Sequence, residues 1–380
     1  MKTNIKKTFK KKNFLFSLAL APVVGAVVLF ASTWQNAKVV TASGSSAVQP
    51  FFDLLAKQYI NESKKNIEIS VQAGGSGTGI NNVARNKSTI GLSSKSPSKM
   101  VKSSTQLQEL WTKNKLKTIT IAHEGIVLIA KLPKDVNLTI NQNNIAKIYQ
   151  AFSGNEQVFI NDLIKNPIRN NFSLKPFARE GGGSTSGTAQ AFYEDNGFKN
   201  INLPTKVKDI LQGKQNYGPY TTSTSESNSQ TYELFAKDGN QDGSITYLSL
   251  GYVLNNKQKI LNDGFTILSY EINDQQYQPT VANIQNNLYN WKRPIDLITS
   301  INNYGQRGII EWILFDDSKT KTKIFNDNGM VPLSLEQLSS MFYDLNSSKE
   351  LSYEYLKENL TKFWVDDNQL KSFGVNDEQN

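Results

Sequence analysis

The spacing of apolar residues changes along this chain between the period of a strand and the period of a helix. Ile67, Ile69 and Val71 alternate with Glu68 and Ser70, which is the pattern of a half-buried strand. The continuous apolar run from 118 to 130 indicates a strand that is buried on both faces. Strand and helix patterns then alternate beyond residue 38, which predicts an α/β protein.

Three segments show helical spacing, because their apolar residues recur every three or four positions. Pro50 suits the first turn of the first helix. The apolar faces that we expect consist of Phe51, Leu54, Leu55 and Tyr59, of Ile80, Val83 and Ala84, and of Ala189, Phe192 and Tyr193.

A loop rich in Gly, Ser and Thr precedes each of these helices, at residues 41–46, 74–79 and 179–188. A helix N-terminus has unpaired N–H groups and about half a positive charge, glycine lets an anion approach the main chain, and hydroxyl groups donate further bonds. In open α/β sheets, ligands bind outside the carboxyl ends of the strands, where these loops lie. Three such helix ends that converge would form a cage for a tetrahedral anion.

The N-terminal segment indicates export. Residues 1–13 are basic, and residues 14–31 form an apolar run broken only by Ser17, Pro22 and Gly25. This is the pattern of a signal peptide or of an anchor with its lysines in the cytoplasm. No convincing small-x-small cleavage site follows, and there is no cysteine to carry a lipid. We therefore expect an uncleaved anchor that holds the body at the outer face of the plasma membrane, with a cleaved signal peptide as the alternative.

Charge and composition exclude several classes of function. The formal charge is +9, but six lysines lie within the first twelve residues, and the remainder carries only +3, so we expect no nucleic-acid partner. The chain has no cysteine and one histidine, which excludes thiol chemistry, disulfides and Cys/His zinc sites. His123 lies within the apolar run, and we interpret it as a structural residue. We expect no catalytic residue, no metal site and no cofactor.

Two apolar segments predict how the body is divided. The run near residue 120 indicates a crossing into a second domain, and residues 291–297 indicate the return. We therefore expect a discontinuous first lobe, residues 39–121 and 291–380, and a second lobe, residues 122–290.

Taken together, these segments resemble the phosphate-binding subunit of the bacterial phosphate ABC transporter, from about Val39 to Leu333. The resemblance rests on several motifs that occur in the family's order. They are 41–50, 74–79, Ile90-Gly91-Leu92-Ser93-Ser94, 123–129, 138–149, Arg179-Glu180 with Ser186-Gly187-Thr188, 243–252 and Gly329-Met330-Val331-Pro332-Leu333.

The resemblance implies a two-lobed periplasmic-binding-protein fold of type II, with the ligand cleft between lobes that two hinge strands join. It implies a monomer that captures inorganic phosphate and delivers it to the permease subunits of an ABC transporter. The phosphate-binding residues that it implies are Ser45, Ser46, Ala47, Ser76, Ser94, Arg179, Ser186, Gly187 and Thr188.

The chain departs from the family's pattern at two places. The loop between Arg179 and Ser186 is longer than usual, so Ser184 and Thr185 compete for the anion contacts. Ser94 stands where a carboxylate accepts the proton of hydrogen phosphate. We therefore expect weaker discrimination against sulfate, unless Glu180 or another acid reaches the site.

Two other classes of function stay open at this point. One is a surface adhesin or ligand-binding protein that keeps the fold and has lost phosphate binding. The other is an exported phosphatase that uses the same anion cage. Calorimetry with phosphate would identify the first, and turnover of a chromogenic phosphate ester would identify the second.

Overall fold

The computed structural model describes residues 38–303, 305–342, 352–363 and 372–373. The basic segment 1–13 and the expected anchor 14–31 lie outside these ranges. Within the ranges, no helix combines the length and the apolar character needed to cross a membrane.

The strands form one large mixed sheet and one small sheet. The large sheet has the order β2-β1-β3-β12-β4-β8-β6-β7, with β13 and β9 also paired to β4, and the small sheet has the order β11-β10-β5. The strands are β1 (Lys38–Gly44), β2 (Ile67–Ala73), β3 (Ile90–Ser93), β4 (Leu116–Ala130), β5 (Thr139–Ile140), β6 (Lys175–Arg179), β7 (Thr222–Thr224), β8 (Ser244–Ser249), β9 (Thr266–Ile267), β10 (Ser269–Ile272), β11 (Gln275–Tyr277), β12 (Lys292–Ser300) and β13 (Met330–Pro332).

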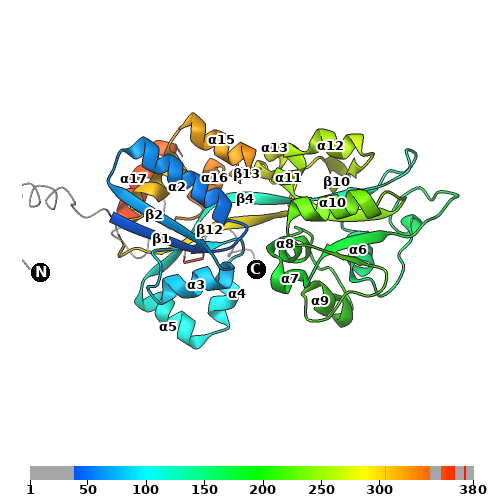
Figure 1. Ribbon diagram of the computed structural model, residues 1–380, viewed down its shortest axis with the longest axis horizontal. Helices are drawn as coiled ribbons and strands as arrows, with labels where there is room; N and C mark the ends of the chain where they lie inside the picture. Colours follow the sequence, from blue (N-terminus) through cyan, green and yellow to red (C-terminus); the bar gives the residue numbers. More distant parts are fainter. Residues whose placement is uncertain (1–37, 304, 343–351, 364–371, 374–380) are drawn as a thin grey trace, which may run out of the picture.

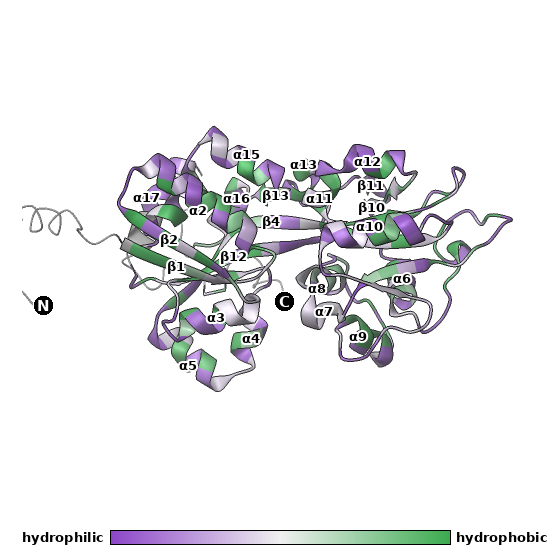
Figure 2. Ribbon diagram, viewed as in Figure 1, coloured by the Kyte–Doolittle hydropathy of each residue, from purple (hydrophilic) through white to green (hydrophobic). Residues whose placement is uncertain are grey.

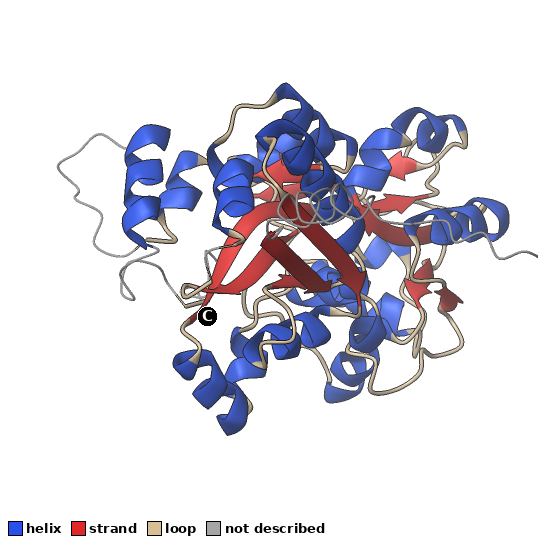
Figure 3. Ribbon diagram, turned by 60° about the vertical axis from the view of Figure 1, so that its left-hand side comes forward, coloured by secondary structure: helices blue, strands red, loops and turns tan. Residues whose placement is uncertain are grey.

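Helices surround the strands on both sides, as Figure 3 shows. They are α2 (Gln49–Ser63), α3 (Ser76–Ala84), α4 (Ser98–Lys102), α5 (Thr105–Lys113), α6 (Ile145–Ser153), the 3₁₀ helix η1 (Ile160–Asp162), α7 (Gly182–Thr185), α8 (Gly187–Glu194), α9 (Thr205–Leu211), α10 (Asn228–Asp238), α11 (Leu250–Asn255), α12 (Lys257–Asn262), α13 (Val281–Gln285), α14 (Arg307–Phe315), α15 (Lys319–Asp327), α16 (Leu335–Ser339) and α17 (Tyr353–Phe363). Single helices carry hydrophobic and hydrophilic residues side by side (Figure 2), because one face of each packs on the sheet while the other meets water.

The predicted two-lobed α/β fold is confirmed. The first lobe contains β1–β3 with α2–α5 and α14–α17, and the second contains β6–β8 with α6–α13 (Figure 1). The long strand β4 runs through both lobes, because its first part pairs with β12 and β13 while residues 126–130 pair with β8. The strands β4 and β12 thus form the hinge. The residue limits that we expect for each lobe stay a prediction.

Each lobe has its own hydrophobic core. In the second lobe, Phe192 stacks on Tyr247 with ring centroids 4.2 Å apart, and Trp291 stacks on Phe192 at 5.3 Å. In the first lobe, Phe51 meets Phe325 edge to face at 5.0 Å, which ties α2 to α15. Since each core is assembled within one lobe, the lobes can turn about β4 and β12 without repacking either core.

The three expected helices are present as α2, α3 and α8, but one apolar residue of α2 points outward. The buried face of α2 contains Phe51, Phe52, Leu55, Ala56 and Tyr59, whereas Leu54 is 43% exposed. At about 100° per residue, the centre of this buried face lies between the directions of Phe51 and Phe52. Leu54 points more than a quarter turn away from that centre. The prediction that Leu54 shares this face is therefore wrong.

Candidate functional site

A polar cleft of about 700 Å³ lies where the Gly/Ser loops of both lobes meet. Its walls are the N-terminal ends of α2 and α3 in the first lobe and of α8 and α10 in the second. The residues that line it are Ser45, Ser46, Ala47, Pro50, Gly74, Gly75, Ser76, Gly77, Thr78, Ser94, Lys95, Glu124, Gly183, Ser184, Thr185, Ser186, Gly187, Thr188, Gln190, Glu226, Ser227, Asn228 and Arg293. Every residue predicted to bind phosphate, apart from Arg179, is among them.

Three serine hydroxyl groups of the first lobe meet at one point of this cleft. The Oγ of Ser45 donates a hydrogen bond to the Oγ of Ser94 at 3.0 Å, and the Oγ of Ser76 lies 3.4 Å from the same atom. The amide of Ser94 also donates to the Oγ of Ser76 at 3.2 Å. These residues come from the ends of β1 and β3 and from the start of α3, so the sheet brings together three segments that are far apart in the sequence.

Backbone amides add donors around these hydroxyl groups. The amides of Ser46 and Ala47, ahead of α2, and those of Gly187 and Thr188, at the start of α8, form no hydrogen bond to another described residue. They belong to the unpaired first turns that make helix N-termini attractive to anions. Gly75, with φ of 83°, turns the chain into α3 in a conformation that favours glycine.

The longer third loop folds into the short helix α7, and the hydroxyl groups of Ser184 and Thr185 form hydrogen bonds within this loop. The Oγ of Ser184 donates to the carbonyl oxygen of Gly181 at 2.7 Å, and the Oγ1 of Thr185 donates to that of Glu180 at 2.6 Å. Ser186 caps α8, because its Oγ accepts a hydrogen bond from the amide of Ala189. The start of α8 therefore faces the cleft despite the insertion.

The lobes touch beside these groups. A Cβ atom added to Gly187 would lie 3.2 Å from the Oγ of Ser94, although the two residues belong to different lobes. At the rim, the Nζ of Lys99 in α4 forms an ion pair with Glu194 at the end of α8, at 3.2 Å. The hydroxyl and amide donors of the two lobes are thus close enough to contact one small ligand.

Arg179 lies behind the cleft wall, with its side chain fully buried. Its Nη1 donates to the carbonyl oxygens of Ser225, Glu226 and Ser227 and to Thr231, and its Nη2 donates to the Oδ1 of Asn228 at 2.6 Å. Burial lowers the pKa of this guanidinium to about 10. The structure therefore places Arg179 beneath the start of α10, not among the residues that it brings together in the cleft.

Arg293, which the sequence reasoning missed, is the arginine that lines the cleft. It lies on β12 directly opposite Glu124 on β4, and its Nε and Nη2 both donate to one carboxylate oxygen of Glu124, at 2.8 and 2.5 Å. Charged residues occur in both hinge segments, but Lys117, Lys292 and Asp296 occur there too, so the sequence does not single out this pair. A charge in a buried strand requires a partner of opposite charge, and here Arg293 and Glu124 are partners of each other.

Two carboxylates reach the cleft, although Glu180 does not. Glu180 is exposed and does not line the cleft, whereas Glu124 and Glu226 both do. The acid that Ser94 fails to supply can therefore come from the hinge. His123, the neighbour of Glu124, is buried within β4. Among the described residues, no three potential His, Cys, Asp or Glu ligands are grouped to hold a metal ion.

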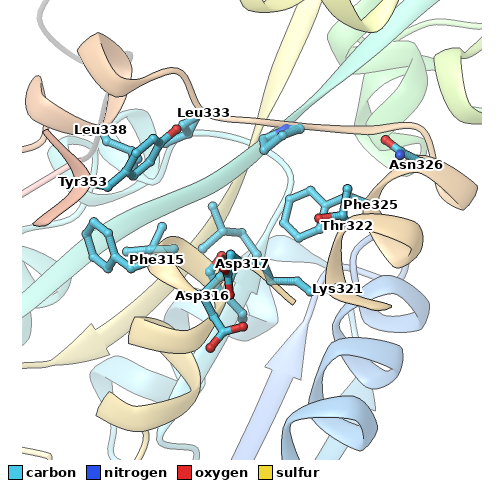
Figure 4. Close-up of a pocket in the computed structure, with 14 residues that line it drawn as sticks. Phe315, Asp316, Asp317, Lys321, Thr322, Phe325, Asn326, Leu333, Leu338 and Tyr353 are labelled. Atoms are coloured by element: carbon cyan, nitrogen blue, oxygen red, sulfur yellow. Dashed lines mark hydrogen bonds between the residues drawn. The ribbon is translucent and has the colours of Figure 1, made fainter. Parts of the chain in front are cut away.

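A second cavity of about 260 Å³ lies within the first lobe, between α14, α15 and α16 (Figure 4). Phe315, Phe325 and Leu338 give it an apolar lining. The Nζ of Lys321 at its wall donates to the carbonyl oxygens of Trp312, Ile313 and Asp316, which end α14. Its ammonium group is thus already occupied, and the convergent donors of the first cleft are not repeated here.

Comparison with known proteins adds three findings. The model of a PBP superfamily domain matches residues 31–313. An uncharacterised lipoprotein of Mycoplasma genitalium is 34% identical over 379 residues, which cover 94% of this chain and 97% of the relative. The phosphate-binding protein PstS of Borreliella burgdorferi is 27% identical over 297 residues, which cover 78% and 90%. The crystal structure of PstS from Borrelia burgdorferi has the same fold, with a TM-score of 0.52 at 20% identity over 78% of this chain and 99% of that one.

Proposed function

The chain belongs to the PBP superfamily, and from this premise we propose that it is an extracytoplasmic solute-binding protein whose ligand is inorganic phosphate. The observation that carries the proposal is the convergence of the Ser45, Ser76 and Ser94 hydroxyl groups with the start of α8 across the cleft. The similarity to a relative that is named a phosphate-binding protein supports the choice of anion.

The chemistry of the cleft suits a tetrahedral oxyanion. A phosphate dianion loses a large hydration free energy when it is buried, so it needs many directed donors in return. Hydroxyl groups, free amides at helix N-termini and a guanidinium supply such donors from several directions. Because they are divided between the lobes, closure about β4 and β12 completes the set around the bound ion.

The rest of the proposal concerns delivery and place. A binding protein of this kind passes its ligand to the permease subunits of an ABC transporter, and it acts as a monomer without catalysing a reaction. Membrane attachment is supported by the Mycoplasma genitalium relative, which is named a lipoprotein. This sequence contains no cysteine, so we assign its attachment to the apolar segment 14–31, at the outer face of the plasma membrane.

Isothermal titration of the full chain in mild detergent tests the proposal. We expect one phosphate ion per chain. Ser94→Ala should weaken binding by about 10- to 150-fold, because a hydrogen bond to a charged group contributes about 1.5–3 kcal/mol. The exposed Ser103→Ala is the matched control and should bind as the wild type does. Wild-type protein that releases no heat with phosphate, and whose melting temperature phosphate leaves unchanged, would contradict the proposal. The same sample should leave a chromogenic phosphate ester intact.

A further inference from the structure

Two buried arginines lie near the cleft, and their guanidinium groups are used in different ways. Arg293 is 1% exposed and Arg179 is fully buried. Only Arg293 belongs to the cleft lining. Each guanidinium keeps one buried nitrogen without a partner, the Nη1 of Arg293 and the Nε of Arg179. Only that of Arg293 belongs to a residue that lines the cleft, so it is the one that a ligand in the cleft can reach.

Arg293 keeps one terminal nitrogen without a partner. Its Nε and Nη2 both donate to the Oε2 of Glu124, while its Nη1 is buried and forms no hydrogen bond. A buried donor of a charged group that stays unpaired is costly, and such exceptions call for an explanation. An oxygen of a bound anion is an acceptor that suits this donor.

The position of this nitrogen matches the rest of the site. A Cβ atom added to Gly187 would lie 2.7 Å from the Nη1 of Arg293 and 3.2 Å from the Oγ of Ser94. The free nitrogen therefore lies where the start of α8 in the second lobe meets a serine of the first lobe. An anion at this point would contact the hinge and both lobes together.

Arg179 has its terminal nitrogens occupied by the protein itself. They donate to three carbonyl oxygens of residues 225–227, to Thr231 and to Asn228, all at or near the start of α10. Glu226, Ser227 and Asn228 line the cleft. Arg179 thus holds part of the cleft wall in place without facing the cleft.

We propose that Arg293, presented by Glu124 across the two hinge strands, is the arginine that binds the anion, and that Arg179 is a positioning residue for the start of α10. This assignment rests on the proposed function. It places the ligand's cationic partner on the hinge, where one bound ion connects the two lobes through the strands about which they turn. Binding and lobe closure are coupled by this contact.

The test compares variants at the two arginines by phosphate titration. Arg293→Gln with Glu124→Gln removes both charges together and so leaves no unpaired buried charge. We expect this double variant to lose about 30-fold or more in phosphate affinity, the loss typical of a charge-assisted hydrogen bond. Arg179→Gln should lose about tenfold or less, and amide exchange at residues 225–228 should accelerate in this variant alone.

A rescue experiment separates binding from positioning. Ethylguanidinium should restore phosphate binding to Arg293→Ala, because the added cation can occupy the vacated site beside Glu124. It should restore little to Arg179→Ala, whose guanidinium bridges several backbone carbonyl groups. If the double variant does not fold, Arg293→Lys decides: it keeps the charge beside Glu124, lacks the forked donors and should bind at least about tenfold more weakly.

The outcomes distinguish this assignment from the proposed function. A folded double variant, or Arg293→Lys, that binds phosphate within about threefold of the wild type would overturn the assignment and leave phosphate binding intact. A larger loss at Arg179→Gln than at the double variant, with rescue at Arg179 only, would also overturn it. Wild-type protein that fails to bind phosphate would overturn the proposed function and this assignment with it.

Discussion

Gly187→Ala is the substitution that probes the contact between the lobes most sharply. The added Cβ atom would lie 2.7 Å from the Nη1 of Arg293 and 3.2 Å from the Oγ of Ser94, while ordinary van der Waals contacts begin at 3.4 Å. The start of α8 would therefore have to move by about 0.7 Å from the guanidinium of the hinge and by about 0.2 Å from the first lobe, and a packed contact does not absorb such a shift without cost.

The size of the effect follows from the cost of overpacking. Inserting a methyl group into a close contact typically costs about 1–3 kcal/mol, which corresponds to roughly 5- to 150-fold in affinity. Because the contact joins the lobes, and each lobe keeps its own core, the cost falls on the form in which the lobes touch, which is the form that a bound ion would stabilise. We expect the melting temperature without ligand to stay close to that of the wild type.

Calorimetric titration with phosphate measures the effect, and Gly77→Ala serves as the matched control. Gly77 also lines the cleft, but a Cβ atom there would meet only Met100, at 3.8 Å. We expect this control to bind phosphate as the wild type does. If Gly187→Ala bound phosphate with wild-type affinity, the lobes would not close on the ligand at this contact, and the geometry proposed for the site would be refuted.

Four further predictions follow from the same structure. Lys99→Met removes the ion pair with Glu194 between the lobes and should weaken phosphate binding by up to about fivefold at low salt, because an exposed pair contributes about 0.2–1 kcal/mol. At 1 M salt the pair is screened and the substitution should have no effect. The control Lys57→Met breaks a pair within α2 and should bind phosphate as the wild type does. Glu124 lines the cleft and would repel a fully ionised anion, so sulfate should displace phosphate only at about 100-fold or greater excess. If sulfate competed with phosphate equally well in the wild type and in Glu124→Gln, this prediction would be contradicted. Small-angle scattering should show a more compact particle with phosphate than without it, and identical curves would argue against hinge closure. Burial lowers the pKa of Lys321 from 10.5 to about 8, so between pH 8 and pH 10.5 the unfolded chain binds more protons than the folded chain. The free energy of unfolding, measured by urea titration, should therefore rise with pH over this range. Lys321→Met should lack this part of the rise.

The arrangement of the loops could be predicted from the sequence because it depends on local patterns. The alternation of apolar and polar residues in β2 predicts a strand within ten residues, and the spacing of apolar residues in α3 predicts a helix within ten. Glycine with serine or threonine marks the start of the helix that follows. The two lobes, and a cleft lined by Ser45, Ser76 and Gly187, follow once strands and helices alternate in that order.

The roles of the two arginines could not be predicted in the same way. Arg179 lies at the expected place before α8, but its hydrogen bonds go to residues 225–228, which only the sheet topology brings next to it. Arg293 faces Glu124 across strands 169 positions apart in the sequence. Spacing along the chain carries no information about such a pair, and each hinge strand contains further charged residues, Lys117 in β4 and Lys292 and Asp296 in β12.

A crystal structure of the full chain grown with phosphate would show whether one anion contacts the hinge and both lobes. We expect a tetrahedral anion between the lobes that accepts hydrogen bonds from the Nη1 of Arg293, the Oγ of Ser94 and the amide of Gly187. An empty cleft at saturating phosphate, or an anion bound away from these three groups, would contradict this expectation.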